Sequence, residues 1–235
     1  MGKNVIVTGA SRGIGFELVK QYVMAGYHVL ALSRNSDRLD LLKKECAALN
    51  SEASVHVLPF DLADGDFESE LIPFVESCFK QVDILVNNAG ALVVKPFTEI
   101  LPEDLDRIYR VNLTAVFRIT QLLMPKFSDH AHILNISSVG GVQGSVKFPG
   151  LSAYSSSKAA LVGLTECLAE EYKETSLVFN CLALGAVQTE MLEEAFPGYE
   201  APTSAKDMAS YIFDFSIKGP EFYKGKVLSV SKSTH

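Results

Sequence analysis

Short aliphatic runs alternate with longer amphipathic segments along the whole chain, and this alternation restricts it to a small set of folds. The runs predict β-strands at 4–7, 27–32, 54–60, 83–86, 132–136, 177–182 and 226–230. The amphipathic segments predict helices at 14–25, 36–49, 67–79, 102–127, 153–172 and 205–216. A strand followed by a helix returns to its sheet in parallel, by a right-handed crossover. We therefore predict a doubly wound α/β fold, with a seven-stranded parallel sheet flanked by helices on both faces.

The chain contains no linker, internal repeat or low-complexity segment that would divide it. Its 235 residues, 48% of them hydrophobic, are enough for one substantial core. We therefore predict a single domain over residues 1–235. Two long segments lack a helix or strand pattern, at about 140–150 and 188–203, and we predict that they border the substrate pocket.

Composition excludes several classes of partner. A net charge of -7 argues against binding to a nucleic-acid backbone, which depends on clustered Lys and Arg. Cys46, Cys78, Cys167 and Cys181 lack the spacing of a zinc site or a disulfide framework, so we predict no metal. The sequence starts without a signal-peptide pattern and holds no apolar run of about 20 residues. We expect a cytoplasmic protein without membrane attachment.

A glycine-rich turn follows the first predicted strand and leads directly into a helix, in the sequence Thr8-Gly-Ala-Ser-Arg-Gly-Ile-Gly15. Gly9 permits a tight turn, Gly13 lets the backbone approach a pyrophosphate, and Gly15 allows close packing of helix on strand. The free N–H groups at the helix start face the anion. This arrangement predicts a dinucleotide site in a Rossmann fold, formed by Gly9, Ser11, Arg12, Gly13, Ile14 and Gly15.

The end of the second strand indicates which dinucleotide is bound. An NAD-binding chain usually places Asp or Glu there to hold the ribose 2′-hydroxyl, whereas this chain has Ser33 and Arg34. Arg34 is placed to pair with a 2′-phosphate, and Arg12 can reach the same group. We therefore predict NADP(H) as the cofactor. The alternative is that both arginines are solvated surface charges.

Tyr154 and Lys158 stand four residues apart at the start of a predicted helix, so both side chains share one face. Moving a phenol from a pKa of about 10 to about 7 requires roughly 4 kcal/mol. An ammonium at about 4 Å supplies roughly that much at an effective dielectric of about 20. The pair is thus a candidate for proton transfer, although amphipathic helices also contain such pairs by chance.

Nearly the whole chain resembles the short-chain dehydrogenase/reductase family. Six motifs, each at the expected strand end or helix, carry the resemblance. They are the glycine turn Thr8 to Gly15, Asp61-Leu62, Asn87-Asn88-Ala89-Gly90, Asn112, the second serine of Asn135-Ile-Ser-Ser138, and Tyr154 with Lys158.

The resemblance implies the roles of a catalytic tetrad. Tyr154 would be the general acid in reduction, or the general base in alcohol oxidation. Lys158 would favour the phenolate and hydrogen-bond the nicotinamide ribose, while Ser138 would bind the substrate carbonyl oxygen. Asn112 would hold a water that relays protons to Lys158; its alternative is a satisfied polar residue in a helix. Ser137 is expected to be structural.

The resemblance also places further residues at the cofactor. Asp61, with Leu62 beside it, would meet the adenine amino group; alternatively, Asp61 caps the helix that follows. Asn87 is expected to tie strands together. The remaining predicted contacts lie along the adenine ribose and the nicotinamide and are Asn88, Ala89, Gly90, Gly185, Val187 and Thr189, together with Tyr154 and Lys158.

The chain departs from the family on the substrate side. Leu184 stands where the family usually has proline, and the segment between Ser138 and Tyr154 is a few residues longer than usual. A mainly apolar pocket would favour a small or hydrophobic ketone, if it is lined by Leu92, Val142, Phe148, Leu184, Met191 and Phe196.

The leading functional prediction is an NADPH-dependent reductase of a ketone, aldehyde or 3-oxoacyl group. One alternative is an NAD(P)-dependent alcohol or hydroxysteroid dehydrogenase that works in the oxidative direction. Another is a low-turnover protein that senses NADPH. Surplus apolar surface on the predicted helices 102–127 and 153–172, together with the resemblance, predicts a homodimer or homotetramer.

Overall fold

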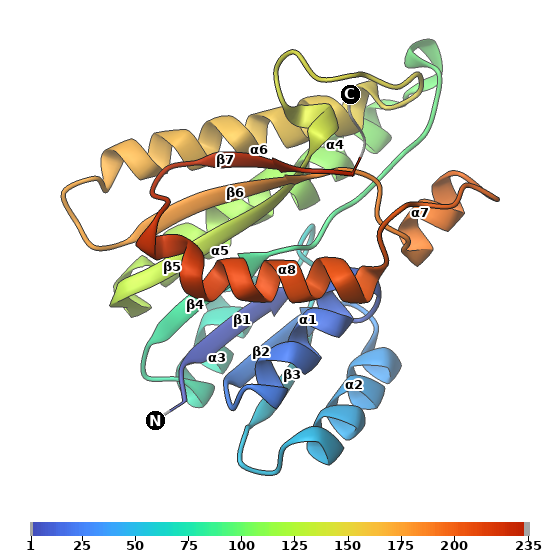
Figure 1. The fold of residues 1–235 in the computed structure, drawn as a ribbon. Helices are drawn as coiled ribbons and strands as arrows, with labels where there is room; N and C mark the ends of the chain where they lie inside the picture. The colour runs from blue at the N-terminus through green and yellow to red at the C-terminus, as the bar shows by residue number, and fades with distance from the viewer. Residues whose placement is uncertain (1, 233–235) are drawn as a thin grey trace.

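The sheet is the centre of the molecule, and its strand order matches the predicted fold. The computed structural model describes residues 2–232. The outer bounds of the predicted domain, residues 1 and 235, lie outside them. The seven strands are parallel and lie in the order β3-β2-β1-β4-β5-β6-β7 (Figure 1). The prediction of a single doubly wound α/β domain is confirmed.

The strand limits agree with the prediction to within two residues, except for one strand. The strands are β1 (Asn4–Thr8), β2 (His28–Ser33), β3 (Val55–Pro59), β4 (Val82–Asn87), β5 (Phe127–Ser138), β6 (Val178–Leu184) and β7 (Val227–Val230). The prediction of a start at 132 for β5 is wrong, because Phe127 already pairs with Val82 of β4. The first four residues of β5, Phe-Ser-Asp-His, are not buried and interrupt the apolar pattern that marks the centre of the strand.

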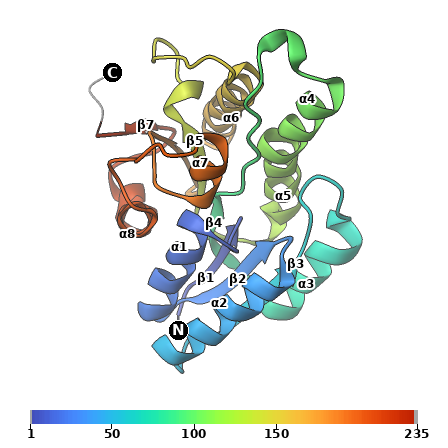
Figure 2. The same cartoon turned by 90° about the vertical axis from the view of Figure 1, so that its right-hand side faces the viewer.

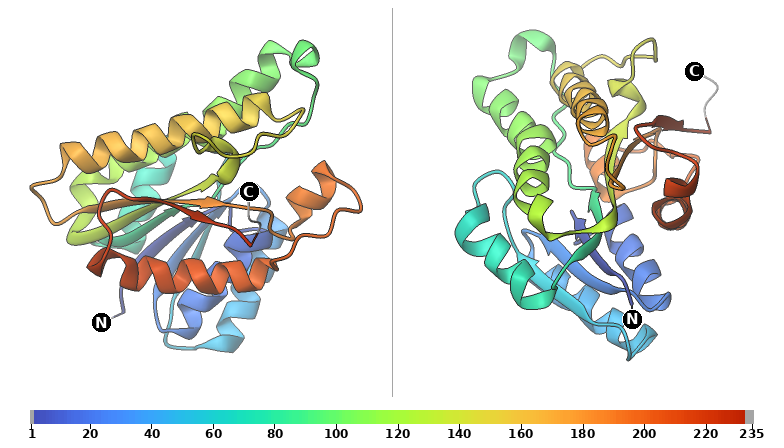
Figure 3. Two further views of the ribbon diagram at one scale, coloured as in Figure 1. Left: turned by 45° about the horizontal axis from the view of Figure 1, so that its top comes forward. Right: turned by 90° about the vertical axis from the view of Figure 1, so that its left-hand side faces the viewer.

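Helices cover both faces of the sheet. One face carries α1 (Gly13–Met24), α2 (Ser36–Leu49) and α8 (Ala205–Lys218); the other carries α3 (Ile72–Cys78), α4 (Pro102–Tyr109), α5 (Ala115–Leu123) and α6 (Ser152–Glu171) (Figure 3). Each layer buries its own apolar cluster against the strands. Among residues 2–232, no helix is long and apolar enough to cross a membrane.

Two predicted helices contain π-helical turns that their periodicity did not reveal. The helix predicted at 102–127 is divided into α4 and α5 by a π turn at Arg110–Thr114, and a 3-10 turn at Met124–Lys126 ends it. The helix predicted at 67–79 starts as a π turn, Phe67–Leu71, and continues as α3. Pro73 explains the second case, because it has no N–H to complete the regular hydrogen-bond pattern.

The segment predicted to be irregular at 188–203 contains a short helix, α7 (Glu190–Ala195). The Thr189 hydroxyl caps it by accepting a hydrogen bond from Leu192 N at 3.2 Å. Glu190 and Glu193 lie in the first turn, where negative charge favours a helix. Figure 2 shows α7 at the carboxyl edge of the sheet, beside α1 (Figure 2).

The strand order creates a crevice at this same edge. β1 pairs with β2 on one side and with β4 on the other, so the direction of the chain's progress across the sheet reverses at β1. Ligands of open α/β sheets bind outside the carboxyl ends of the strands at such a switch point. Thr8, Asn87 and Ser138 are the last residues of β1, β4 and β5, so the motifs that follow them in the sequence meet here.

Candidate active site

Lys158 is a buried cation beside the phenol of Tyr154. Both lie near the start of α6, and the Lys158 side chain is only 3% exposed. Its ammonium donates a hydrogen bond to the Ile136 carbonyl at 2.9 Å and lies 6.0 Å from the centre of the Tyr154 ring. Burial lowers the pKa of Lys158 to about 8, against a smaller opposing effect of Cys181.

The Tyr154 hydroxyl lies close enough to Ser138, the last residue of β5, for that side chain to influence its pKa. Burial raises the pKa of Tyr154, and Ser138 opposes that rise. The phenol is therefore protonated at neutral pH and can act as an acid. The structure thus brings together three of the four residues predicted for catalysis, from β5 and α6.

The two serines at the end of β5 have different surroundings. The Ser137 hydroxyl donates to the Lys158 carbonyl at 2.9 Å and so ties β5 to α6. Ser138 instead faces Tyr154, and its oxygen accepts from Gly140 N at 3.3 Å. This geometry agrees with the expectation that Ser137 is structural.

Asn112 lies in the π turn between α4 and α5 and is completely buried. Its amide nitrogen donates to the Ala91 carbonyl at 3.0 Å and to the Ser157 hydroxyl at 2.9 Å. Its amide oxygen accepts from Ala91 N at 2.7 Å. Both amide protons are therefore used within the protein, so the side chain joins the loop after β4 to α6. The structural role of the amide is thus visible in these contacts, and the water relay to Lys158 stays a prediction.

The glycine-rich turn has the conformation that the sequence predicts. Gly9 and Gly13 have φ of +70° and +57°, which side chains rarely adopt. A Cβ on Gly15 would lie 2.3 Å from the Gly9 carbonyl oxygen, so the helix start packs too closely for any side chain. Ile14 packs against the core cluster on the face of the sheet that carries α1, α2 and α8.

Thr8 joins the glycine turn to the segment after β4. Its hydroxyl accepts hydrogen bonds from the backbone N–H groups of Asn88 and Ala89, both at 3.0 Å. The Asn88 amide donates in turn to the Thr8 carbonyl at 3.0 Å. Asn87 binds the side chain of Asn135 on β5 at 2.8 Å, as its predicted role of tying strands requires.

The adenine end of the crevice is defined by residues after β2 and β3. Ser33 donates to Ser11 at 2.7 Å, and the Arg34 guanidinium lies 3.9 Å from the Asp61 carboxylate. Asp61 accepts from Ala63 N at 2.9 Å, whereas Asp66 is the residue that caps the following helical turn. The alternative role of Asp61 as that cap is therefore wrong. Leu62 packs against the other core cluster.

A cavity of about 330 Å³ lies between the glycine turn, α1, α2 and α7. It is lined by Ser11, Arg12, Gly13, Phe16, Glu17, Arg38, Leu41, Glu190 and Ala205. Arg38 was not identified from the sequence, although it lies only one helical turn after Arg34. Its position in the first turn of α2 was the available signal, because that turn begins where the 2′-phosphate is expected.

The nicotinamide end is formed by the chain after β6. A Cβ on Gly185 would lie 2.4 Å from the Ser231 hydroxyl oxygen, and Val187 is buried in the core. Thr189 caps α7 and packs over the glycine turn, since a Cβ on Gly13 would lie 3.2 Å from its methyl group.

Leu184 does not belong to the pocket, contrary to the sequence prediction. It pairs with Ser138 and Val230 in the sheet and is only 6% exposed, within the core cluster of the α1, α2 and α8 face. An aliphatic side chain therefore fills core volume at the position where the family usually has proline.

The residues present fit a dinucleotide. A Cβ on Gly90 would lie 3.7 Å from the Lys158 ammonium and 3.6 Å from the Asn112 amide oxygen, so the absent side chain leaves room beside Lys158. Arginines gather at the opposite, adenine end, where a phosphate would need them. The arrangement can therefore hold a dinucleotide with its reactive end beside the Tyr154 hydroxyl.

Comparisons with known proteins agree with this geometry. A sequence profile described as short chain dehydrogenase matches residues 3–200. The chain is 33% identical over 195 residues to the 3-oxoacyl-acyl-carrier-protein reductase FabG of Thermotoga maritima, covering 82% of this chain and 77% of that protein. It is 32% identical over 190 residues to carbonyl reductase (NADPH) 2 of Sus scrofa, covering 81% and 74%.

Among solved structures, a short chain dehydrogenase from Shigella flexneri complexed with NADP superposes with a TM-score of 0.86 at 28% identity, over 97% of this chain and 96% of that one. The chain therefore belongs to the short-chain dehydrogenase/reductase family and is an NAD(P)-dependent oxidoreductase that acts on small molecules.

Proposed function

We propose that the protein is an NADPH-dependent reductase of a ketone, aldehyde or 3-oxoacyl group. The observation that carries the proposal is the buried Lys158 ammonium 6.0 Å from the centre of the Tyr154 ring, with Ser138 beside the same phenol. The two relatives described above have names that describe carbonyl reduction, which supports this direction.

In this proposal, the substrate carbonyl oxygen lies between the hydroxyls of Ser138 and Tyr154. Ser138 donates a hydrogen bond that orients the oxygen, and Tyr154 transfers its phenolic proton to it. When bound, NADPH supplies the hydride for the carbonyl carbon. The Lys158 ammonium stabilises the phenolate left on Tyr154, because the site is buried and water screens the charge poorly.

The substrate is proposed to be a hydrophobic carbonyl compound. The predicted loop at 140–150 lies against the loop after β4, where Lys95 N donates to the Gly150 carbonyl at 3.1 Å. Apolar side chains project from this rim, including Val94 at 40% and Phe148 at 53% exposure. Exposed apolar groups next to an active site favour an apolar ligand.

A panel of carbonyl compounds tests the proposed activity. NADPH absorbance should fall with hydrophobic ketones, aldehydes or 3-oxoacyl thioesters. Tight NADPH binding without turnover of any carbonyl compound or alcohol would favour a sensor instead. Turnover confined to alcohols with the oxidised cofactor would favour a dehydrogenase that works in the oxidative direction.

The preference for NADPH depends on Arg34 in this proposal. Arg34→Ala is expected to weaken NADPH binding by about 10- to 100-fold, the value of a charge-assisted phosphate contact. NADH binding should change by less than about threefold, because NADH lacks the 2′-phosphate. Dissociation constants of both cofactors, measured by calorimetry, provide the check.

Arg107→Ala is the matched control, since Arg107 also lies beside Asp61, at 3.8 Å. It should leave the ratio of the two affinities unchanged. An Arg34→Ala variant that lost equal affinity for NADPH and NADH would contradict the assignment of Arg34 to the 2′-phosphate.

We also propose a homodimer or homotetramer. Leu101, Leu105 and Phe117 are exposed by 54%, 44% and 47% on the helical layer of α4 and α5. Light scattering at micromolar concentration should show a multiple of the 25.6 kDa chain mass. Phe117→Glu should shift the mass toward the monomer, because it places charge on an apolar surface. A monomeric wild-type protein would contradict this part of the proposal.

A further inference from the structure

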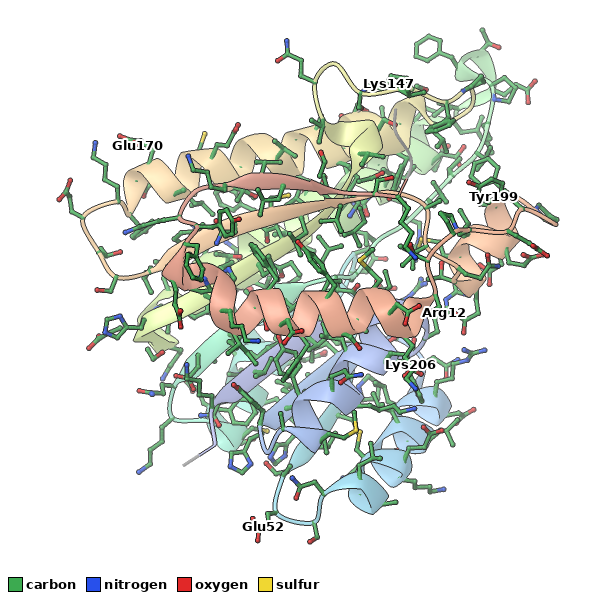
Figure 4. The ribbon with its side chains drawn as sticks, viewed as in Figure 1. Arg12, Glu52, Lys147, Glu170, Tyr199 and Lys206 are labelled. Atoms are coloured by element: carbon green, nitrogen blue, oxygen red, sulfur yellow. The ribbon has the colours of Figure 1, made fainter. Side chains whose placement is uncertain are left out.

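Helix α7 is held by the two arginines of the cavity described above. The Arg12 guanidinium forms a two-pronged ion pair with Glu194, one of whose hydrogen bonds measures 3.0 Å. The Arg38 guanidinium donates to Glu190 at 3.3 Å. Figure 4 shows Arg12 at the same end of the molecule as α7 (Figure 4). Both arginines therefore have carboxylates of α7 as partners.

The charges that line this cavity cancel. Arg12 and Arg38 contribute two positive charges, and Glu17 and Glu190 contribute two negative ones. Glu194 adds a further carboxylate on Arg12. A phosphate monoester carries about -1.5 to -2 charges at neutral pH, so it competes with these carboxylates for the same guanidinium groups and is repelled by them at close range. A 2′-phosphate at Arg12 and Arg38 thus requires that Glu190 and Glu194 move away.

We propose that Glu190 and Glu194 are specificity-determining residues that occupy the 2′-phosphate site in place of the phosphate. NADP(H) displaces them from Arg38 and Arg12 and releases α7. NAD(H), which has no 2′-phosphate, leaves both ion pairs in place. The inference rests on the proposed function and extends its 2′-phosphate site to Arg38.

The position of α7 connects this exchange to the other end of the crevice. Thr189 begins α7 through its capping hydroxyl and packs over Gly13 of the glycine turn. A displacement of Glu190, the next residue, therefore moves the segment expected at the nicotinamide. As a result, the segment around Thr189, which borders the nicotinamide and the substrate, takes one position with NADP(H) bound and another with NAD(H) bound.

Calorimetric titration of the apoprotein with NADP⁺ and with NAD⁺ tests the proposal without any turnover. The double variant Glu190→Gln/Glu194→Gln keeps the shape of both side chains and removes their charge. Its affinity for NADP⁺ should rise by about tenfold, because two partly exposed ion pairs no longer compete with the phosphate. Its affinity for NAD⁺ should change by less than about twofold.

Glu193→Gln is the control on the same helix. Glu193 accepts from Gly198 N at 3.1 Å and pairs with neither arginine, so this variant measures the general effect of one lost charge. The single variant Glu194→Gln should bind NADP⁺ severalfold more tightly than Glu193→Gln does. The difference should shrink as salt is added, since ion pairs this exposed are screened.

The fluorescence of an introduced tryptophan can detect movement of α7 directly. The chain has no tryptophan, so Tyr199→Trp, placed in the loop just after α7, gives a single emission signal. NADP⁺ should shift this emission and NAD⁺ should not, while the double variant should show the shifted emission before any cofactor is added.

The results separate the two proposals. If the wild-type protein binds NADP⁺ more tightly than NAD⁺ but the double variant binds NADP⁺ no better than Glu193→Gln does, the role of the two glutamates is wrong and the proposed function stands. If the wild-type protein shows no preference for NADP⁺ and the double variant gains none, both are wrong.

Discussion

Tyr154→Phe is expected to lower the turnover of carbonyl substrates by about 10²- to 10⁴-fold, the usual contribution of a positioned general acid. The substitution keeps the aromatic ring beside Lys158 and removes only the hydroxyl near Ser138. Packing and cofactor binding should therefore persist. Steady-state kinetics should show the loss in kcat, and NADPH titration should show a dissociation constant within about threefold of the wild-type value.

Tyr211→Phe is the matched control, because Tyr211 lies on α8 and is 42% exposed. It should retain full activity. Turnover of Tyr154→Phe within about threefold of the wild type would show that another group supplies the proton, and the proposed mechanism would then be wrong.

Lys158→Met is expected to stop catalysis and to stabilise the protein without cofactor. Burial lowers the pKa of Lys158 from 10.5 to about 8. Below about pH 8 the lysine is charged in the folded protein, and burying this charge lowers the free energy of unfolding. Removing that charge should raise the free energy of unfolding at neutral pH by up to about 3 kcal/mol. Turnover should fall by at least about 10²-fold, because the phenolate of Tyr154 loses its neighbouring charge.

The lowered pKa of Lys158 makes the free energy of unfolding depend on pH. Between pH 8 and 10.5 the unfolded chain binds more protons at this lysine than the folded chain does, so the wild-type protein gains stability as the pH rises through this range. Urea unfolding at several pH values should therefore show the difference between Lys158→Met and the wild type shrinking toward high pH.

Lys44→Met provides the control, because Lys44 is exposed on α2. Its effect on the free energy of unfolding should stay within about 0.5 kcal/mol at every pH. A Lys158→Met protein less stable than the wild type at neutral pH would mean that the hydrogen bond to the Ile136 carbonyl outweighs the cost of burying the charge.

Cofactor binding and lysine burial are thus connected energetically. A buried ammonium destabilises the empty protein, and a residue retained at such a cost is typical of a functional site. In the proposed complex the ammonium hydrogen-bonds the nicotinamide ribose, and this contact would offset part of the cost. We therefore expect the cofactor to stabilise the wild-type protein more than Lys158→Met, and urea unfolding of both proteins with and without NADPH measures the difference.

The parts of the fold that sequence predicted well are those encoded by neighbouring residues. Period-two and period-3.6 patterns are local, so the strands and helices emerged in the correct order. The π turn at Asn112 was missed because it accompanies hydrogen bonds to Ala91, a residue on a different loop. The helix α7 was missed because six residues are too few for a clear periodic pattern.

The residues of the candidate site likewise fall into those that the sequence predicts and those that only the structure reveals. The glycine turn, the four residues proposed for catalysis and Arg34 could be predicted because the chemistry proposed for them requires particular residues at fixed spacings. Arg38, Glu190 and Glu194 match no such spacing. Their importance became visible only when the cavity between α1, α2 and α7 was known.

The sequence by itself determined the doubly wound fold, the dinucleotide turn and the alignment of Tyr154 with Lys158, because each depends on residues within one or two consecutive elements. Only the tertiary structure decided what surrounds Arg12 and Arg38, the arginines proposed to bind the 2′-phosphate together with Arg34. Glu194 lies 182 residues from Arg12, and Glu190 lies 152 residues from Arg38. Whether such distant charges meet depends on where the chain returns after β6, and that path is set by the packing of the whole sheet.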